Sequence, residues 1–161
     1  MELRYSADNV RYKRMTSPEL RESYVVNNLY TPDEVPLTYS DIDRGVIGSA
    51  VPVNKVLELP IHKELACDYF TQRREIGVLN IGGPGCIKVN DESYDLVFED
   101  SLYIGRGNEN ITFSSVDSSN PAKFYFVSYP AHKVYPTKLV TKAQANAIEM
   151  GSLETANKRV I

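Results

Sequence analysis

A charged run at Gln72–Glu75 leads directly into an apolar segment at Ile76–Ile81 and is the strongest concentration of charge in the sequence. Adjacent residues on a strand point to opposite faces, so Arg73 and Glu75 are predicted to share one face and Arg74 to take the other. A guanidinium binds a carboxylate through two hydrogen bonds, which indicates a clamp for an anion or a sugar acid. The alternative, which we favour, is a salt bridge between domains or subunits.

A second polar cluster lies at Tyr129–Lys138, where two prolines hold the chain extended. Its histidine, tyrosines and lysines offer hydrogen-bond donors to a polyhydroxy ligand, although they would equally suit a contact between subunits. The sequence indicates no catalytic residue. The candidate substrate-binding residues are Arg73, Arg74, Glu75, His132 and Lys138.

The histidines are too few for a metal centre. A catalytic divalent metal normally needs about three protein ligands, most often histidine with a carboxylate. This chain has only His62 and His132, and no His-x-His pair. Cys67 and Cys86 are too few for a disulfide framework or a cysteine-type zinc site, and they suit a reducing compartment. Cys67 could pair with a histidine as a nucleophile, but cysteine is more often simply buried. We expect neither a metal nor a cofactor in this chain.

Composition excludes several classes of partner. The chain has 161 residues, of which 42% are hydrophobic and 24% charged, as expected for one globular domain. Its 18 basic and 21 acidic residues give a net charge of −3, which disfavours binding to nucleic acid or to an anionic membrane. No apolar run is long enough to span a bilayer, and no signal peptide follows Met1. We expect a cytoplasmic protein.

Short alternating segments separated by turn residues predict a mainly all-β fold. Turns too short to hold helices exclude a parallel α/β sheet, and Gly82–Gly85 is interpreted as a hairpin turn and not as a phosphate loop. Eight such strands at regular spacing indicate a sandwich or barrel. The predicted strands are Val46–Val53, Val56–Leu59, Ile76–Ile81, Cys86–Val89, Tyr94–Phe98, Ser101–Ile104, Ile111–Ser114 and Lys123–Ser128.

Three parts of the chain are predicted. Residues 1–37 form a polar amino-terminal arm, with a helix starting at Ser17 as the cap and Pro18 in the first helical position. Residues 38–138 form the β-barrel. Residues 139–161 contain a short helix over Thr141–Met150, closed by a glycine, and then the start of an interdomain linker.

The spacing of these pieces resembles the cupin barrel, an antiparallel jelly roll. The first cupin motif places a glutamate after His-x-His and a glycine six residues beyond, and Glu75 and Gly82 match that spacing. Asp68 and Phe70 stand where the two histidines would be, and Asn110 stands where the third would be. Phenylalanine has no lone pair to donate to a metal. The resemblance therefore implies a cupin domain without its metal.

A closer resemblance covers nearly the whole chain and is specific as a set of motifs. These motifs are similar to the amino-terminal half of the 5-keto-4-deoxyuronate isomerase (4-deoxy-L-threo-5-hexosulose-uronate ketol-isomerase) family. The matching segments are Tyr39–Arg44, Tyr69–Gly83, Leu102–Gly107, Pro121–Tyr125 and Pro130–Lys138.

The resemblance implies a two-cupin protein of bacterial pectin and uronate breakdown that forms a homo-oligomer, a hexamer in the family. Such a protein interconverts 5-keto-4-deoxyuronate and 3-deoxy-D-glycero-2,5-hexodiulosonate. Its zinc is implied to lie in the carboxy-terminal cupin, which this chain does not contain. We therefore expect a fragment or a truncated gene product, inactive alone, whose partner is the missing carboxy-terminal cupin.

Within such an enzyme, this half would act either as a clamp for the substrate carboxylate or as a scaffold and oligomer interface. We favour the scaffold. The alternative from another class is a metal-free module that binds or senses a sugar acid, with its pocket at the barrel mouth around Glu75.

Overall fold

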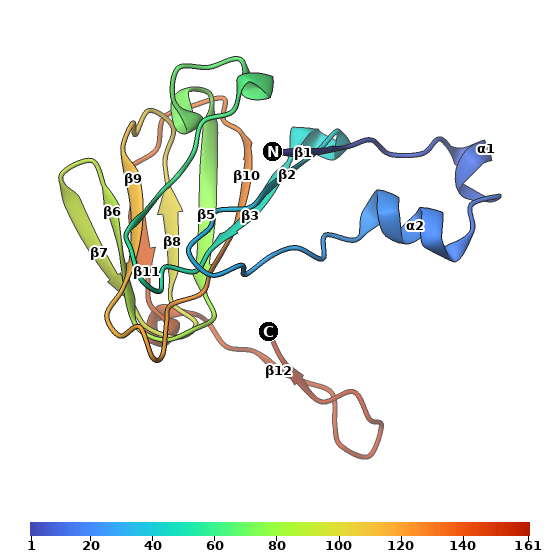
Figure 1. The fold of residues 1–161 in the computed structure, drawn as a ribbon. Coiled ribbons are helices and arrows are strands. Elements are labelled where there is room, and N and C mark those ends of the chain that lie inside the picture. Colours follow the sequence, from blue (N-terminus) through green and yellow to red (C-terminus); the bar gives the residue numbers. More distant parts are fainter.

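Two β-sheets packed face to face form the body of the protein (Figure 1). The computed structural model describes residues 1–161. The larger sheet has seven strands in the order β1-β2-β3-β10-β5-β8-β11, and the smaller has four in the order β4-β9-β6-β7. Neighbours are antiparallel except for β1 and β2. Their bounds are β1 Glu2–Arg4, β2 Leu37–Ser40, β3 Val46–Ala50, β4 Leu57–Glu58, β5 Arg74–Asn80, β6 Gly85–Val89, β7 Glu92–Leu96, β8 Ser101–Ile104, β9 Ile111–Ser115, β10 Phe124–Pro130 and β11 Lys138–Val140.

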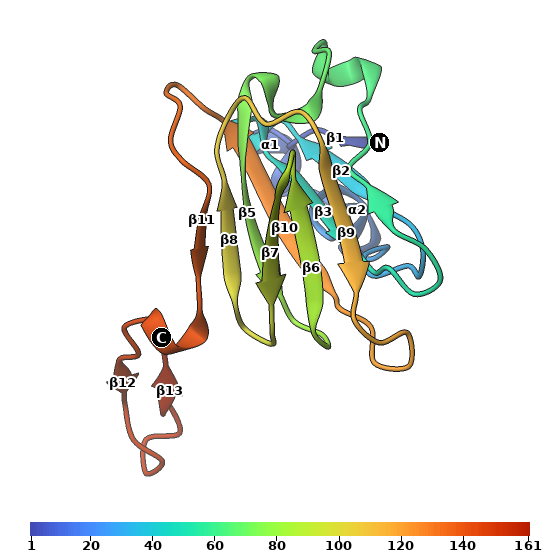
Figure 2. The same cartoon turned by 90° about the vertical axis from the view of Figure 1, so that its left-hand side faces the viewer.

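Two segments extend from this body on the side of the larger sheet (Figure 1). The arm carries helices α1 (Asn9–Tyr12) and α2 (Ser17–Tyr24). The tail carries a hairpin of β12 (Glu149–Met150) and β13 (Arg159–Val160). Figure 2 shows this hairpin below the end of β11. None of the helices has the length and apolar character that a membrane span requires. Short 3-10 helices lie at Ile42–Arg44, Lys63–Leu65, Phe70–Gln72 and Lys142–Gln144.

Phenylalanine rings fill the space between the two sheets. Phe113 of the smaller sheet stacks on Phe126 of the larger sheet with ring centroids 5.9 Å apart, and its ring lies 5.6 Å from that of Phe124. Glycine is required beside them, because a Cβ built on Gly48 would lie 2.5 Å from Phe126 and one on Gly85 would lie 2.7 Å from Phe124. The core is therefore packed around aromatic side chains that only glycine neighbours admit.

Asn80, at the end of β5, connects the two sheets at one end of the sandwich. Its fully buried side-chain amide donates to the carbonyls of Gly83 and Leu96, at 2.9 and 3.1 Å. Its carbonyl oxygen accepts from the backbone N–H groups of Gly82 and Lys123. All the hydrogen-bonding capacity of this amide is thus used in holding the β5–β6 turn against β7 and the start of β10.

Polar contacts position the arm, since neither helix buries a residue. Arg4 donates to the backbone carbonyl of Val25 at 2.6 Å, at the end of α2. The Asp41 carboxylate accepts from the backbone N–H of Ser6 at 2.8 Å. The capping box at the start of α2 has Thr16, one residue earlier than predicted, as its cap.

The eight predicted strands are confirmed, and so is a mainly β fold with short peripheral helices. The sheets are not closed into a barrel and form an open sandwich instead. The helix predicted over Thr141–Met150 is limited to one 3-10 turn, because the chain then extends into the β12–β13 hairpin. Strands β1, β2 and β11, which the sequence analysis missed, are short and add to the edges of the larger sheet.

A matched pair of glycine substitutions tests the packing of the core. Gly48→Ala is expected to lower the free energy of unfolding by about 1–3 kcal/mol, because the new Cβ overlaps Phe126 and Leu37. Gly77 lies on β5, on the outer face of the larger sheet, and a Cβ built there meets no atom within 4 Å. Gly77→Ala is therefore expected to raise the free energy of unfolding by about 0.5 kcal/mol. Denaturant unfolding measures both, and equal effects would contradict this account of the core.

Candidate functional site

Arg74 is a buried cation with no acidic partner. Its side chain points into the core at the start of β5, and the residue is 7% exposed. The guanidinium donates to the hydroxyl and carbonyl of Ser128 at 3.1 and 2.8 Å and to the carbonyl of Arg44 at 2.6 Å. Burial lowers its pKa. Arg74 therefore connects β5 to β10 and to the turn before β3 through Nε and Nη2.

Glu75 lies on the opposite face of β5, the outer face of the larger sheet. Its carboxylate accepts a 2.7 Å hydrogen bond from the hydroxyl of Tyr103 on β8. Burial and, to a smaller extent, that hydrogen bond raise the pKa of Tyr103 to about 12. Both residues line a groove of about 420 Å³ together with Lys138 and Tyr135. The sugar-acid pocket predicted at a barrel mouth around Glu75 is thus misplaced, because this side chain faces away from the space between the sheets.

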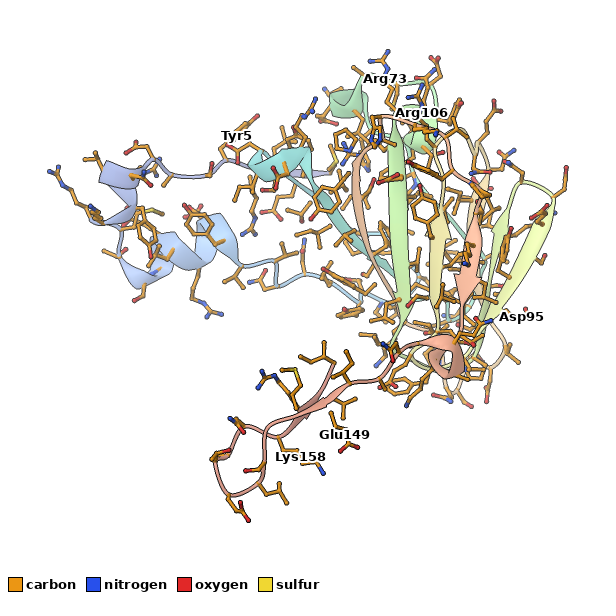
Figure 3. The ribbon with its side chains drawn as sticks, turned by 180° about the vertical axis from the view of Figure 1, so that it is seen from behind. Tyr5, Arg73, Asp95, Arg106, Glu149 and Lys158 are labelled. Atoms are coloured by element: carbon orange, nitrogen blue, oxygen red, sulfur yellow. The ribbon has the colours of Figure 1, made fainter.

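Arg73 and His132 lie at one end of the sandwich, near Arg106. The backbone carbonyl of Arg73 accepts from the N–H of Ala131, and Arg106 donates to the carbonyl of Ala131 at 3.2 Å. Figure 3 shows Arg73 and Arg106 at this same end. His132 meets the ring of Tyr135 edge-on at a centroid distance of 6.4 Å.

The largest cleft lies beside this end and encloses about 880 Å³. Arg106 is its one basic residue, and carboxylates, amides and hydroxyls supply the rest of its polar lining. The Asn108 side chain is held in place by a 2.7 Å hydrogen bond to the carbonyl of Gly105. The polar lining residues are Asn90, Asp91, Glu92, Tyr94, Arg106, Asn108, Tyr135 and Thr137.

The five candidate residues from the sequence do not form one site. Glu75 and Lys138 line the outer groove, whereas Arg74 points into the core. Arg73 precedes β5 and does not form a salt bridge with Glu75. The sequence analysis did not single out Tyr103 and Arg106. The signal for Tyr103 was its position between two apolar residues on a strand, which places its hydroxyl on the outer face.

The positions that resemble a cupin metal motif do not converge. Phe70 is part of the core, Asp68 accepts from the Gln72 side chain at 2.9 Å, and the backbone of Asn110 donates to Asn90. Glu75 projects from the outer face. No three His, Cys, Asp or Glu side chains lie close enough together to hold a metal ion. The residues of this chain therefore do not fit a zinc site. The family resemblance implies zinc in the other cupin.

Burial shifts the pKa of the two thiols and of the second histidine. Burial raises the pKa of the Cys67 and Cys86 thiols, which disfavours the nucleophilic thiolate. Burial also lowers the pKa of His62, whose Nδ1 lies 3.2 Å from the amino terminus. The structure thus offers hydrogen-bond donors to a ligand but not a paired nucleophile and base.

Comparison with known proteins identifies relatives that match the whole chain. It is 48% identical over 161 residues to a 4-deoxy-L-threo-5-hexosulose-uronate ketol-isomerase of Lachnoclostridium phytofermentans, covering 100% of this chain and 58% of the relative. An enzyme of the same name from Formosa agariphila is 46% identical over 99% of this chain and 57% of its own length. The chain thus spans somewhat more than half the length of these relatives and corresponds to their amino-terminal portion.

Among solved structures, an IolB-like protein from Salmonella typhimurium superposes with a TM-score of 0.53 at 12% sequence identity. The match covers 72% of this chain and 42% of that one, and at this identity it supports the fold alone. The model of the KduI/IolB family matches residues 27–161. With that match and relatives 46–48% identical along essentially its whole length, this chain belongs to the KduI/IolB family.

Proposed function

We propose that this chain is the amino-terminal half of a uronate ketol-isomerase that interconverts 5-keto-4-deoxyuronate and 3-deoxy-D-glycero-2,5-hexodiulosonate. The observation that carries the proposal is 46–48% identity, along essentially the whole chain, to relatives named as ketol-isomerases. Such an isomerisation moves a proton between adjacent carbons and requires a polarising group at the oxygens and a base nearby. The side chains described above do not form that pair, so this half alone is proposed to be inactive.

The internal contacts of the charged run support a scaffold role. The guanidinium of Arg74 is used by backbone carbonyls and a serine hydroxyl, and the carboxylate of Glu75 is used by Tyr103. A clamp for the substrate carboxylate needs a guanidinium that is free to donate two hydrogen bonds. Within the run, that leaves Arg73 at the end of the sandwich.

The remaining features of the family resemblance belong to this proposal. Zinc is assigned to the carboxy-terminal cupin, and the complete protein is proposed to be a cytoplasmic homo-oligomer, a hexamer, in pectin and uronate breakdown. Its proposed partners are the carboxy-terminal cupin and a uronate substrate.

A second candidate function is binding of a sugar acid without turnover. It is favoured by the 880 Å³ cleft, in which one guanidinium, Arg106, lies among amide and hydroxyl groups suited to a polyhydroxy ligand, beside the carboxylates of Asp91 and Glu92. This cleft replaces the location around Glu75 that the sequence indicated.

Activity measurements test whether this half is inactive alone and active when it is joined to the carboxy-terminal portion of a relative. The isolated chain is expected to give no turnover of 5-keto-4-deoxyuronate above the uncatalysed rate. A chimera in which it replaces the matching segment of the Lachnoclostridium phytofermentans relative is expected to turn the substrate over. Substrate turnover by the isolated chain would show that the reacting groups lie in this half.

The titration of Tyr103 tests whether Glu75 is engaged within the protein. Glu75→Gln removes the negative charge beside the phenol, so the pKa of Tyr103 is expected to fall from about 12 toward the ordinary value of 10.0. Because the native pKa is raised, its contribution to stability is present below pH 10 and is lost as the pH rises toward 12. NMR of ring-labelled tyrosine measures this, and Glu92→Gln beside Tyr94 is the matched control. An unchanged Tyr103 titration in Glu75→Gln would show that the carboxylate is free.

Calorimetric titration with galacturonate separates the two candidate functions. A scaffold is expected to give no saturable heat. Saturable heat that Arg106→Ala abolishes, but that Arg159→Ala on the exposed tail leaves unchanged, would establish the binding module instead. Saturable heat that is abolished in Arg73→Ala would support the interpretation of Arg73 as a clamp for the substrate carboxylate.

A further inference from the structure

The outer face of the smaller sheet is polar, as expected for a face in water. On β6 and at the start of β9 the buried positions alternate with outward-facing ones, and on β7 only Leu96 is buried. The register pairs Lys88 with Ser93 on one side and with Thr112 on the other, and Cys86 is the one weakly polar member. The outward-facing residues are Glu58, Cys86, Lys88, Ser93, Asp95, Thr112 and Ser114.

The outer face of the larger sheet is apolar and aromatic. Gly48, Phe126 and Ile76 mark the inward positions of β3, β10 and β5, so their neighbours along each strand point outward. Across the three adjacent strands β10, β5 and β8, the one charged outward residue is Glu75, which accepts a hydrogen bond from Tyr103. The outward residues of these strands and of β3 are Ile47, Ser49, Glu75, Gly77, Leu79, Ser101, Tyr103, Tyr125, Val127 and Tyr129.

Gly77 lies at the middle of this face, paired with Val127 of β10 on one side and with Tyr103 of β8 on the other. The residue is exposed, and a Cβ built on it meets nothing within 4 Å. A glycine inside a strand weakens the strand and is typical of a place where another backbone or a ligand approaches closely. Nothing within this chain requires glycine here, in contrast to Gly48.

The arm and the tail border the same face. Figures 1 and 3 show both segments on the side of the larger sheet that faces away from β6 and β7. The end of α2 lines a groove of about 240 Å³ together with Ile47 and Tyr129. The tail is rich in exposed apolar side chains, with Leu153 at 81% and Val160 at 62% exposure.

We propose that the outer face of β10, β5 and β8 is the docking surface for the carboxy-terminal portion that the ketol-isomerase relatives carry. This inference rests on the proposed function, because it takes this chain as one half of such an enzyme. A surface with an apolar centre and few charges is typical of the buried core of an interface. An antiparallel sheet with one face in water commonly has polar residues on that face, whereas strands buried on both faces are apolar on both.

The relatives supply an occupant of suitable size. This chain covers 57–59% of their lengths, so about 40% of each relative lies beyond the match, which is enough for one further domain. The tail brings the chain from β11 to the side on which the apolar face lies (Figure 1). A domain connected through the tail therefore needs no crossing to the polar face of the smaller sheet.

Cysteine footprinting tests the docking surface. Gly77→Cys and Tyr129→Cys place thiols on the proposed surface, and Lys88→Cys is the control on the polar face. Labelling by a maleimide, located by peptide mapping, is compared between the isolated chain and the chimera with the Lachnoclostridium phytofermentans relative. Both surface positions are expected to react at least about tenfold more slowly in the chimera, with Lys88→Cys unchanged. If the chimera does not fold, the aligned positions of the full-length relative replace it.

Equal labelling rates at both surface positions in the chimera and the isolated chain would overturn the proposal. Slow labelling already in the isolated chain, together with a dimer in sedimentation, would also overturn it, in favour of a second copy. Turnover by the chimera is recorded in parallel. An active chimera with unprotected positions refutes the docking surface alone, and a protected but inactive chimera refutes the proposed function alone.

Discussion

The aromatic layer between the sheets is the constraint on which the rest of the structure depends. Phe113, Phe124 and Phe126 occupy the space in which a β-barrel can hold a small ligand. Gly48 and Gly85 are the positions that make room for these rings. Because the interior is filled in this way, groups that could bind a ligand are found at the end of the sandwich and on the outer face of the larger sheet, where the clefts lie.

The polar groups that remain near this layer are used to hold strands together. Asn80 satisfies four backbone groups, and Arg74 satisfies two carbonyls and a hydroxyl. A buried polar group without such partners would be strongly destabilising, so each side chain has several hydrogen-bond partners where it is found. This explains why the densest charged run in the sequence does not produce one open anion site. Its members are divided between the core, the outer face and the end of the sandwich.

Alternation of apolar and polar residues was sufficient to predict the eight strands β3 to β10, because each of them has buried residues on one of its faces. It could not predict the short strands β1, β2 and β11, which have three or four residues and depend on pairing with distant segments. It also misled at Thr141–Met150, where alanine and a capping box favour a helix but no apolar face packs on the body. The candidate site was less predictable than the fold, because the direction of Arg74 and Glu75 follows from which phase of β5 is buried.

That phase is ambiguous for a physical reason. In β5, Ile76 and Val78 form one apolar set, while Gly77 and Leu79 form another that carries only Glu75 as a charge. A strand with one face in water has a polar set that reveals its orientation, as β6 and β7 do with Lys88 and Asp95. β5 and β10 of the larger sheet lack such a polar set. On β10, the outward residues include Tyr125 and Val127. The failure to orient the charged run from sequence and the apolar outer face are therefore one property, which is that of a sheet with two faces to cover.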